Sequence, residues 1–140
     1  MLGLEIPRGI FDAMIEQARA EAPLEACGIL AGREQSVERW RKMTNRDRSS
    51  EHFMMEPAEQ FKLVKELRAA GLQMLAVYHS HPETPARPSD EDIRLALTPN
   101  IVHVIISLQD PNRPTVKGYE IDQGCVAEVN VCVVDVMPQR

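Results

Sequence analysis

Residues 74–92 read MLAVYHSHPETPARPSDED. The first part, 74–81, is a short apolar run that ends at a proline, which predicts a buried strand. The next seven residues, 82–88, contain three prolines and predict a stiff, irregular loop. A serine then begins a predicted short helix over 89–98, which stops before the next proline. We therefore expect a strand end and a helix start to lie close together.

Two histidines stand at the end of the predicted strand. Because side chains alternate along a strand, His79 and His81 point to one face and Ser80 points to the other. A His-x-His pair is a common way to present two nitrogen ligands to one metal. Asp92, in the first turn of the following helix, can supply a carboxylate. Three protein ligands with an open fourth position are typical of catalytic zinc.

The same helix start has a second interpretation. Ser89 and Asp92 have the spacing of a capping box, with Ser89 as the N-cap. Asp90 and Glu91 then favour the positive end of the helix dipole. The two interpretations are compatible, because a serine hydroxyl has one donor and two acceptor sites.

Other metal sites fit the pattern less well. Metallo-β-lactamase sites need His-x-His-x-Asp-His, whereas Pro82, Glu83 and Thr84 follow His81 here. Amidohydrolase sites belong to barrels of about 200 residues or more. Zinc deaminases need His-x-Glu and Pro-Cys-x-x-Cys, which the chain lacks. Two histidines and one carboxylate also suit Fe(II), so iron stays a chemical alternative to zinc.

The rest of the chain alternates between helical and strand patterns. We expect helices at 7–20 and 57–70, and strands at 25–32, 37–44, 52–55, 101–108, 115–122 and 125–136. Gly71 is expected to cap the second helix, whose apolar face comprises Phe61, Leu63, Val64 and Leu67. With the segment above, this order predicts an α/β (α+β) fold, in which about three helices pack on one mixed sheet.

Composition sets the broad class of protein. The chain has 140 residues, which suits one domain over 1–140, with 44% hydrophobic and 26% charged residues. A net charge of −5 argues against a nucleic-acid partner. We see no signal peptide and no apolar run long enough to span a membrane. Three cysteines at irregular positions do not form a disulfide framework and predict a cytoplasmic protein.

For three further residues the sequence predicts no catalytic role. His103 lies in an apolar strand, and we expect it to be a core or edge histidine. His52 precedes a strand in a polar segment, where a role at the edge of a substrate has no support beyond its position. Cys27 lies two residues from Glu25, but we expect it to serve packing because cysteine is among the most buried residue types.

Taken together, the spacing resembles a known family. His79-Ser80-His81, seven residues, Ser89, two residues and Asp92 match the signature of the JAMM (MPN+) metalloproteases. The family's distant glutamate matches Glu25, within the segment Pro-x-Glu-x-Cys-Gly-x-Leu-x-Gly over 23–32 that is typical of the short bacterial members. The resemblance extends from the first predicted helix to about residue 119. The complete motif separates active members from metal-free MPN scaffolds.

The resemblance implies a cytidine-deaminase-like MPN domain that binds one Zn²⁺ per chain. In this family His79, His81 and Asp92 would ligate zinc, Glu25 would be the general acid/base, and Ser89 would hydrogen-bond near the oxyanion. Active members cut the peptide or isopeptide bond after the C-terminal Gly-Gly of ubiquitin or a ubiquitin-like protein. The short bacterial members process sulfur-carrier proteins and release cysteine or a short extension, in cysteine or other sulfur-containing biosynthesis.

Two other functions stay open at this stage. One is a zinc peptidase that acts on small peptides or amino-acid conjugates without a protein carrier. The other is a non-catalytic MPN scaffold or binding module, against which the intact set of motif residues argues.

Overall fold

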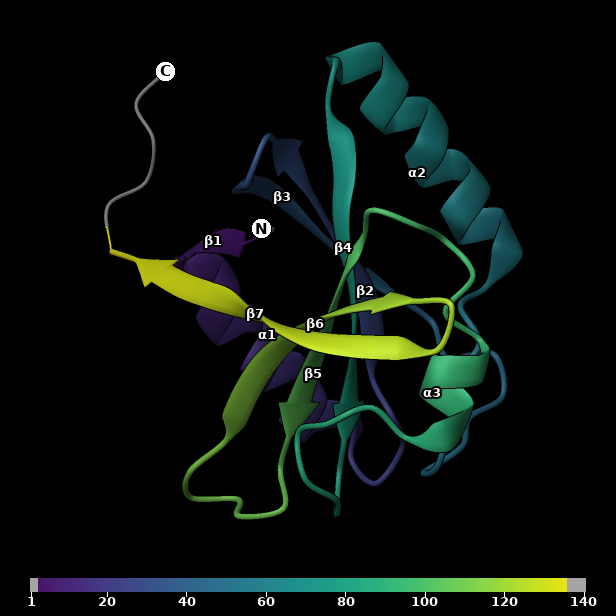
Figure 1. Ribbon diagram of the computed structural model, residues 1–140, viewed down its shortest axis with the longest axis vertical. Helices are drawn as coiled ribbons and strands as arrows, with labels where there is room; N and C mark the ends of the chain where they lie inside the picture. Colours follow the sequence, from purple (N-terminus) through teal and green to yellow (C-terminus); the bar gives the residue numbers. More distant parts are fainter. Residues whose placement is uncertain (1–2, 136–140) are drawn as a thin grey trace.

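Seven strands form one closed barrel in the computed structural model, which describes residues 3–135 (Figure 1). Their order around the barrel is β1-β3-β2-β4-β5-β6-β7. The strands are β1 (Gly3–Pro7), β2 (Cys27–Arg33), β3 (Ser36–Met43), β4 (Gln73–His81), β5 (Val102–Ser107), β6 (Thr115–Asp122) and β7 (Cys125–Val134). The sheet is mixed: β4 pairs antiparallel with β2 and parallel with β5, and β1 runs parallel to β7.

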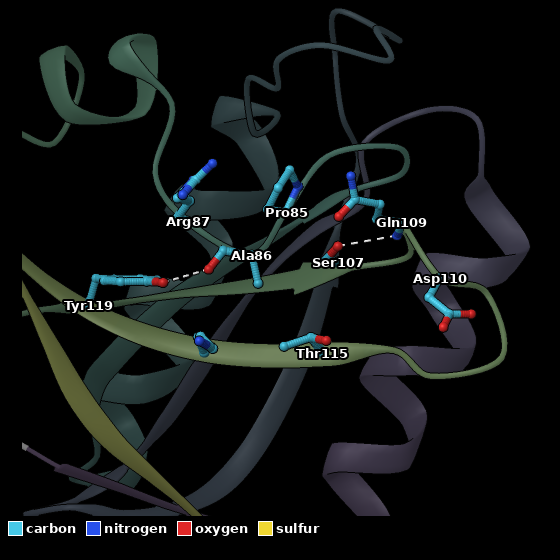
Figure 2. Close-up of a pocket in the computed structure, with 9 residues that line it drawn as sticks. Pro85, Ala86, Arg87, Ser107, Gln109, Asp110, Thr115 and Tyr119 are labelled. Carbon is cyan, nitrogen blue, oxygen red and sulfur yellow. Dashed lines mark hydrogen bonds between the residues drawn. The ribbon is translucent and has the colours of Figure 1, made fainter.

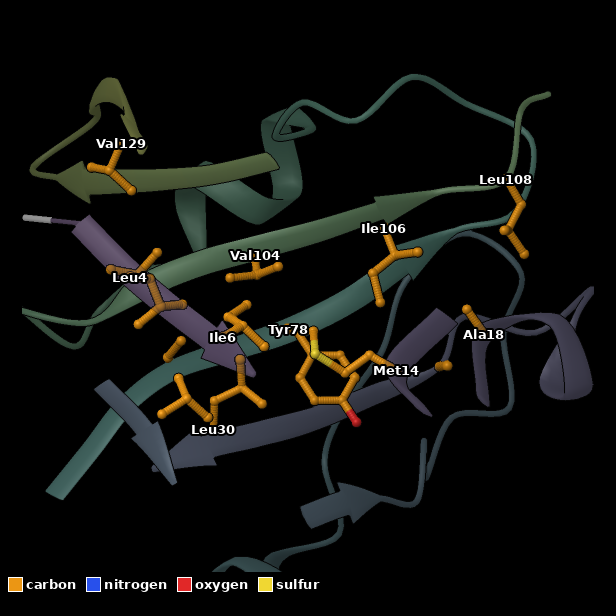
Figure 3. Packing of buried hydrophobic residues seen from close by; sticks show 14 residues of the cluster. Leu4, Ile6, Met14, Ala18, Leu30, Tyr78, Val104, Ile106, Leu108 and Val129 are labelled. Atoms are coloured by element: carbon orange, nitrogen blue, oxygen red, sulfur yellow. The ribbon is translucent and has the colours of Figure 1, made fainter. Parts of the chain in front are cut away.

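Three helices accompany the barrel within the described residues: α1 (Arg8–Glu21), α2 (Pro57–Ala70) and α3 (Asp90–Arg94). The inner core takes Leu30 from β2 and Tyr78 from β4, and Met14 and Ala18 of α1 pack against it (Figure 3). Alternate residues of the same strands face the other way. There α2 packs Leu63 and Leu67 over the outer face of β2.

Tyr78 ties the inner core together through its hydroxyl group. The indole N–H of Trp40 donates to this hydroxyl at 2.6 Å, and the hydroxyl donates to Gln17 Oε1 at 2.5 Å. Gln17 in turn donates to the carbonyl of Cys27 at 3.1 Å. Because buried polar groups are costly unless paired, this network fixes α1 against the strands that carry the candidate site.

Most predicted elements are confirmed, with shifts of one or two residues at their ends. Gly71 caps α2 with φ 70°, and Ser89 and Asp92 form the capping box of α3. The mixed sheet with about three helices is confirmed, although the sheet closes into a barrel. The last residue of the predicted strand 125–136 lies outside the described residues.

Four expectations were wrong. The strand β1 was missed, because Pro7 ends it and directly caps α1, so no turn separates the two patterns. Residues 52–55 form only a single bridge, between Asn45 and Met55, and α3 ends at Arg94 instead of residue 98. Phe61 and Val64 are 65% and 40% exposed instead of packing with the rest of their helix face.

None of the helices in residues 3–135 is long and apolar enough to cross a membrane.

We predict that alanine at position 28 will destabilise the protein. Gly28 lies directly opposite Tyr78 in the β2–β4 pairing, and a Cβ there would overlap the tyrosine ring. Overpacking of this kind costs about 1–3 kcal/mol. A Cβ at Gly9 in α1 meets nothing within 4 Å, so Gly9→Ala should instead raise stability by up to about 1 kcal/mol. Urea unfolding followed by circular dichroism measures the midpoint, which should fall for Gly28→Ala and rise for Gly9→Ala. A shift of both midpoints in the same direction would contradict this prediction.

Candidate active site

The candidate site lies on the outer face of the barrel, at the end of β4. His79 and His81 are only 3% and 4% exposed, and both face outward because Tyr78 and Ser80 face inward. The strand lies between β2 and β5, whose pairing residues fix its register. The two imidazoles are therefore held side by side by the sheet.

Three ligand-type atoms converge at this point. The Nε2 atoms of His79 and His81 are 3.1 Å apart, and they lie 3.1 and 3.2 Å from Oδ2 of Asp92. Zinc bonds of about 2.0–2.2 Å in a tetrahedron separate neighbouring ligand atoms by roughly 3.3–3.6 Å. Two imidazole nitrogens and one carboxylate oxygen at these separations fit a zinc ion with one position open. The structure thus brings together the three residues that the motif suggested.

Asp92 is positioned by the start of α3. The backbone N–H of Ser89 donates to Oδ2 of Asp92 at 2.9 Å, and the N–H of Asp92 donates to Oγ of Ser89 at 3.0 Å. The oxygen that closes the capping box is the same oxygen that faces the histidines. Burial raises the pKa of Asp92, but hydrogen bonds with His79 and His81 outweigh it and hold the pKa well below its ordinary value.

A backbone carbonyl group fixes the tautomer of the His81 ring. Its Nδ1 lies 2.9 Å from the carbonyl oxygen of Pro85. A carbonyl can only accept, so Nδ1 carries the proton, and Nε2 of the neutral ring presents its lone pair to the site. Burial lowers the pKa of His81, but the bonds to Asp92 and Pro85 outweigh it and raise the pKa overall. Burial is also the main cause of the lowered pKa of His79.

Glu25 faces the histidines from the segment that leads into β2, the strand next to β4. Extending the Cys27–His79 pairing by two residues places Glu25 opposite His81, on the same outer face. Its side chain is 4% exposed, and its Oε1 is buried without a hydrogen-bond partner. Burial raises the pKa of this carboxyl to about 8, with His81 opposing and Asp92 and Glu91 adding to the shift. A carboxyl with such a pKa can take and return a proton near neutral pH.

Asn45 holds the chain around Glu25. The sequence did not predict this role of Asn45. Its side-chain amide donates to the carbonyl oxygens of Glu25 and His52, each at 3.0 Å. The N–H of Glu25 donates to the carbonyl of Ser49 at 2.8 Å. The stretch from Asn45 to Pro57 resembles the family, but an asparagine after a strand is ordinary loop composition and predicts no particular role. Asn45 therefore fixes the segment 45–53 against the backbone of the candidate acid/base.

A groove of about 400 Å³ opens beside the site. His79 and Asp92 line its inner end, where the ring of Phe53 stacks on His79 with centroids 4.5 Å apart. One wall comes from residues 52–55 and the other from residues 91–98, and its lining is mainly apolar. His52 and His103 both line it, so His103 is a groove residue as well as part of a strand.

Comparison with known proteins identifies the family. Residues 7–121 match the family model described as prokaryotic homologs of the JAB domain. The chain belongs to this family. The match spans nearly the same residues as the JAMM resemblance and confirms it.

Relatives of this JAB protein carry peptidase names. It is 39% identical over 134 residues to a CysO-cysteine peptidase of Mycobacterium tuberculosis, covering 94% of this chain and 92% of the relative. It is 40% identical over 96 residues to a probable TtuB-protein conjugate cleaving protease of Thermus thermophilus, covering 68% of this chain and 64% of that protein. The JAB protein is accordingly a hydrolase that acts on peptide bonds.

Two solved structures show the same fold. The solution structure of protein DSY2949 from Desulfitobacterium hafniense is 40% identical, with a TM-score of 0.88 over 96% of this chain and 94% of the other. A structure described as a JAMM metalloprotease-like zinc site in the proteasome and signalosome has a TM-score of 0.61. It covers 96% of this chain and 100% of the other at 24% identity, which shows the fold alone.

We predict that Cys27 of the JAB protein resists alkylation in the folded state. Cys27 is buried, and burial raises the pKa of its thiol to about 12, so almost no thiolate is present at pH 8. Cys125 and Cys132 are exposed. Native protein treated with iodoacetamide should gain two labels and urea-unfolded protein three, as read by intact mass and peptide mapping. Rapid labelling of Cys27 in the native protein would instead show that solvent reaches the β2 side of the site.

Proposed function

We propose that this JAB protein is a zinc-dependent peptidase that cuts after the C-terminal Gly-Gly of a ubiquitin-like sulfur-carrier protein. The (iso)peptide bond would join the terminal glycine to a cysteine or to a short extension, which is released. The observation that carries the proposal is the groove that ends at His79 and Asp92, with Glu25 facing the same point. The names of the relatives, which refer to CysO and TtuB conjugates, support the substrate class.

His79, His81 and Asp92 would hold one zinc ion through the three atoms that already converge. When bound, zinc supplies Lewis acidity, which lowers the pKa of water and polarises the scissile carbonyl. Fe(II) suits the same ligands, but peptide hydrolysis needs Lewis acidity without redox chemistry, which favours zinc.

Glu25 would move the proton of the reaction. Its carboxylate takes a proton from the water whose oxygen attacks the carbonyl carbon. When the C–N bond breaks, the same group returns the proton to the leaving nitrogen, so that a free amine departs. General acid/base catalysis of this kind contributes about 10²–10⁴-fold to the rate. The buried, unpartnered Oε1 of Glu25 leaves that atom available for this transfer.

Ser89 would stabilise the oxygen that gains charge. Its Oγ accepts from the N–H of Asp92, which uses an acceptor site and leaves the hydroxyl proton to donate. The capping role therefore sets the position of Ser89 without consuming its donor. A donor held before the reaction begins is the kind of group that stabilises an oxyanion.

The groove would receive the extended tail of the carrier. Its rim includes Leu97, which is 82% exposed, and Met54 and Leu95, which are also exposed. Addition of the tail as an extra strand is less suited to this molecule, because the barrel closes and leaves little free edge beside β4. Glycine at the end of the tail would let its backbone approach the ligands closely.

We further propose that residues 1–140 act as one domain and that the reaction takes place in the cytoplasm, where the three free cysteines stay reduced. A peptidase of small peptides is the alternative that the same site would allow. The convergence of His79, His81 and Asp92 supports a metal-dependent enzyme over a metal-free scaffold.

The first prediction from this function concerns a carrier that ends in Gly-Gly and is extended by one cysteine or a short peptide. Incubated with zinc-loaded protein, it should lose the extension, as read by intact mass. Glu25→Gln should retain one zinc by elemental analysis and lose about 10²–10⁴-fold in rate. His79→Ala should lose both zinc and turnover, because it removes a ligand atom.

Two controls sharpen this experiment. A chelator should stop the reaction, and added zinc should restore it. The isolated C-terminal peptide of the carrier should be cut much less efficiently than the whole carrier, whereas equal kcat/KM values would favour the small-peptide alternative. Full activity of Glu25→Gln would show that another group moves the proton.

A second prediction tests the groove. Leu97→Asp should raise KM for the carrier conjugate about 5–30-fold, since burial of a leucine side chain contributes about 1–2 kcal/mol at such a surface. The value of kcat should change little, because Leu97 is exposed at the rim and is none of the proposed ligands or catalytic groups. Asn112→Asp adds the same charge in the β5–β6 connection, outside the groove, and serves as the matched control. Equal KM values for the two variants would place the tail elsewhere.

A further inference from the structure

Three consecutive carbonyl groups of the 82–88 loop each accept a hydrogen bond from a side chain of the sheet. Ser107 Oγ donates to the carbonyl of Thr84 at 2.6 Å. His81 Nδ1 donates to that of Pro85 at 2.9 Å. The hydroxyl of Tyr119 donates to that of Ala86 at 2.5 Å, as Figure 2 shows. The carbonyl that orients His81 is therefore flanked on both sides by carbonyls held by hydroxyl groups.

The two hydroxyl groups come from neighbouring strands. Ser107 pairs directly with His81 across β4 and β5, and Tyr119 lies on β6, which follows β5 in the barrel. Both side chains are buried. Ser107 Oγ also accepts from the N–H of Gln109 at 3.2 Å, which fixes its orientation. The loop is thus tied to β5 and β6, beside the strand β4 that carries His79 and His81.

Packing holds this loop at one residue: Ala86 is buried against the cluster that contains Ile105 and Tyr119. An open pocket of about 280 Å³ adjoins the loop, lined by Pro85 and Arg87 of the loop and by Thr115 and Lys117 of β6. Thr84 and Pro85 are exposed. At these two exposed residues packing contributes little, so the hydrogen bonds contribute most to holding their carbonyl groups in place.

We propose that Ser107 and Tyr119 are positioning residues that hold the Pro85 carbonyl against His81. The proposal rests on the proposed metal site, because it explains how that ligand keeps the correct tautomer and ring orientation. The aromatic ring of Tyr119 packs with Ala86, Ile105 and Ile121, a role that phenylalanine could fill. The hydroxyl group of Tyr119, by contrast, donates to the Ala86 carbonyl and so holds the loop.

Tyr119→Phe and Ser107→Ala, made in the full chain, test the proposal. Partners that orient a metal-bound histidine typically contribute 10–100-fold to metal affinity. Each variant should therefore weaken zinc binding about 10-fold, measured by competition with a chromophoric chelator. In the metal-free protein, ¹⁵N NMR should show the Nδ1 proton of His81 exchanging with water about 10-fold faster or more, because its carbonyl partner is less well held.

Tyr78→Phe is the matched control. It also removes a buried tyrosine hydroxyl, on the strand that carries the ligands, but its partners are Trp40 and Gln17 in the inner core. It should lower the Tm while leaving zinc affinity and His81 ring-proton exchange within about twofold of the wild type. The same change in ring exchange in all three variants would show a general loss of stability and would overturn the proposal.

The outcomes separate this proposal from the proposed function. Wild-type protein that binds no zinc would overturn the metal-dependent function, while ring-proton exchange would still decide whether the two hydroxyls position His81. Unchanged exchange and unchanged zinc affinity in both Tyr119→Phe and Ser107→Ala would overturn the positioning role, even if the enzyme cuts its carrier.

Discussion

The pairing of Ser80 with Ala26 is the interaction on which the site depends. Ser80 Oγ accepts from the N–H of Ala26 at 2.7 Å, and the N–H of Ser80 donates to the carbonyl of Ala26 at 2.9 Å. This double tie continues the β2–β4 register past the end of β2, into a segment that has no strand conformation of its own. Because Ser80 faces inward, the histidines on either side of it face outward, and Glu25 is brought opposite His81. One buried serine therefore sets the positions of residues that lie more than 50 positions apart in sequence.

Asp92 shows how one oxygen can satisfy two structural demands. Its Oδ2 closes a capping box and also faces two imidazoles, so the start of α3 and the ligand cluster stabilise the same rotamer. A carboxylate held by a backbone N–H and by two histidines stays charged, and this negative charge favours a cation at the point where the three atoms meet. The short helix has no fully buried residue, although Ile93 packs against the cluster that contains Ile105 and Tyr119, and its first turn places the Asp92 side chain.

The sequence predicted well which three residues converge, because the atoms concerned lie in one short stretch. Alternation on a strand and capping-box spacing are local rules, and both hold for His79, His81, Ser89 and Asp92. The remote contributions were not accessible in the same way. The Pro85 carbonyl carries no side-chain signal, Asn45 resembles any loop asparagine, and β1 merges with α1 at Pro7. Closure of the barrel depends on β1 meeting both β7 and β3, which no local pattern encodes. Phe61 and Val64 follow the helical period but extend beyond the area that the barrel can cover.

The two faces of β4 have different roles in the molecule. The inner face, with Ala76 and Tyr78, is closed by the core, and little can move there without loss of packing. The outer face is bounded by two segments of irregular structure, 45–56 and 82–88, which are held by side-chain hydrogen bonds and by the packing of Met55 and Ala86. Such segments can be adjusted by single polar contacts while the barrel stays unchanged. This arrangement explains why the apolar groove can remain open beside a buried ligand cluster. The strand holds the two histidines in place, whereas the walls of the groove beside them come from 52–55, in one of these segments, and from 91–98.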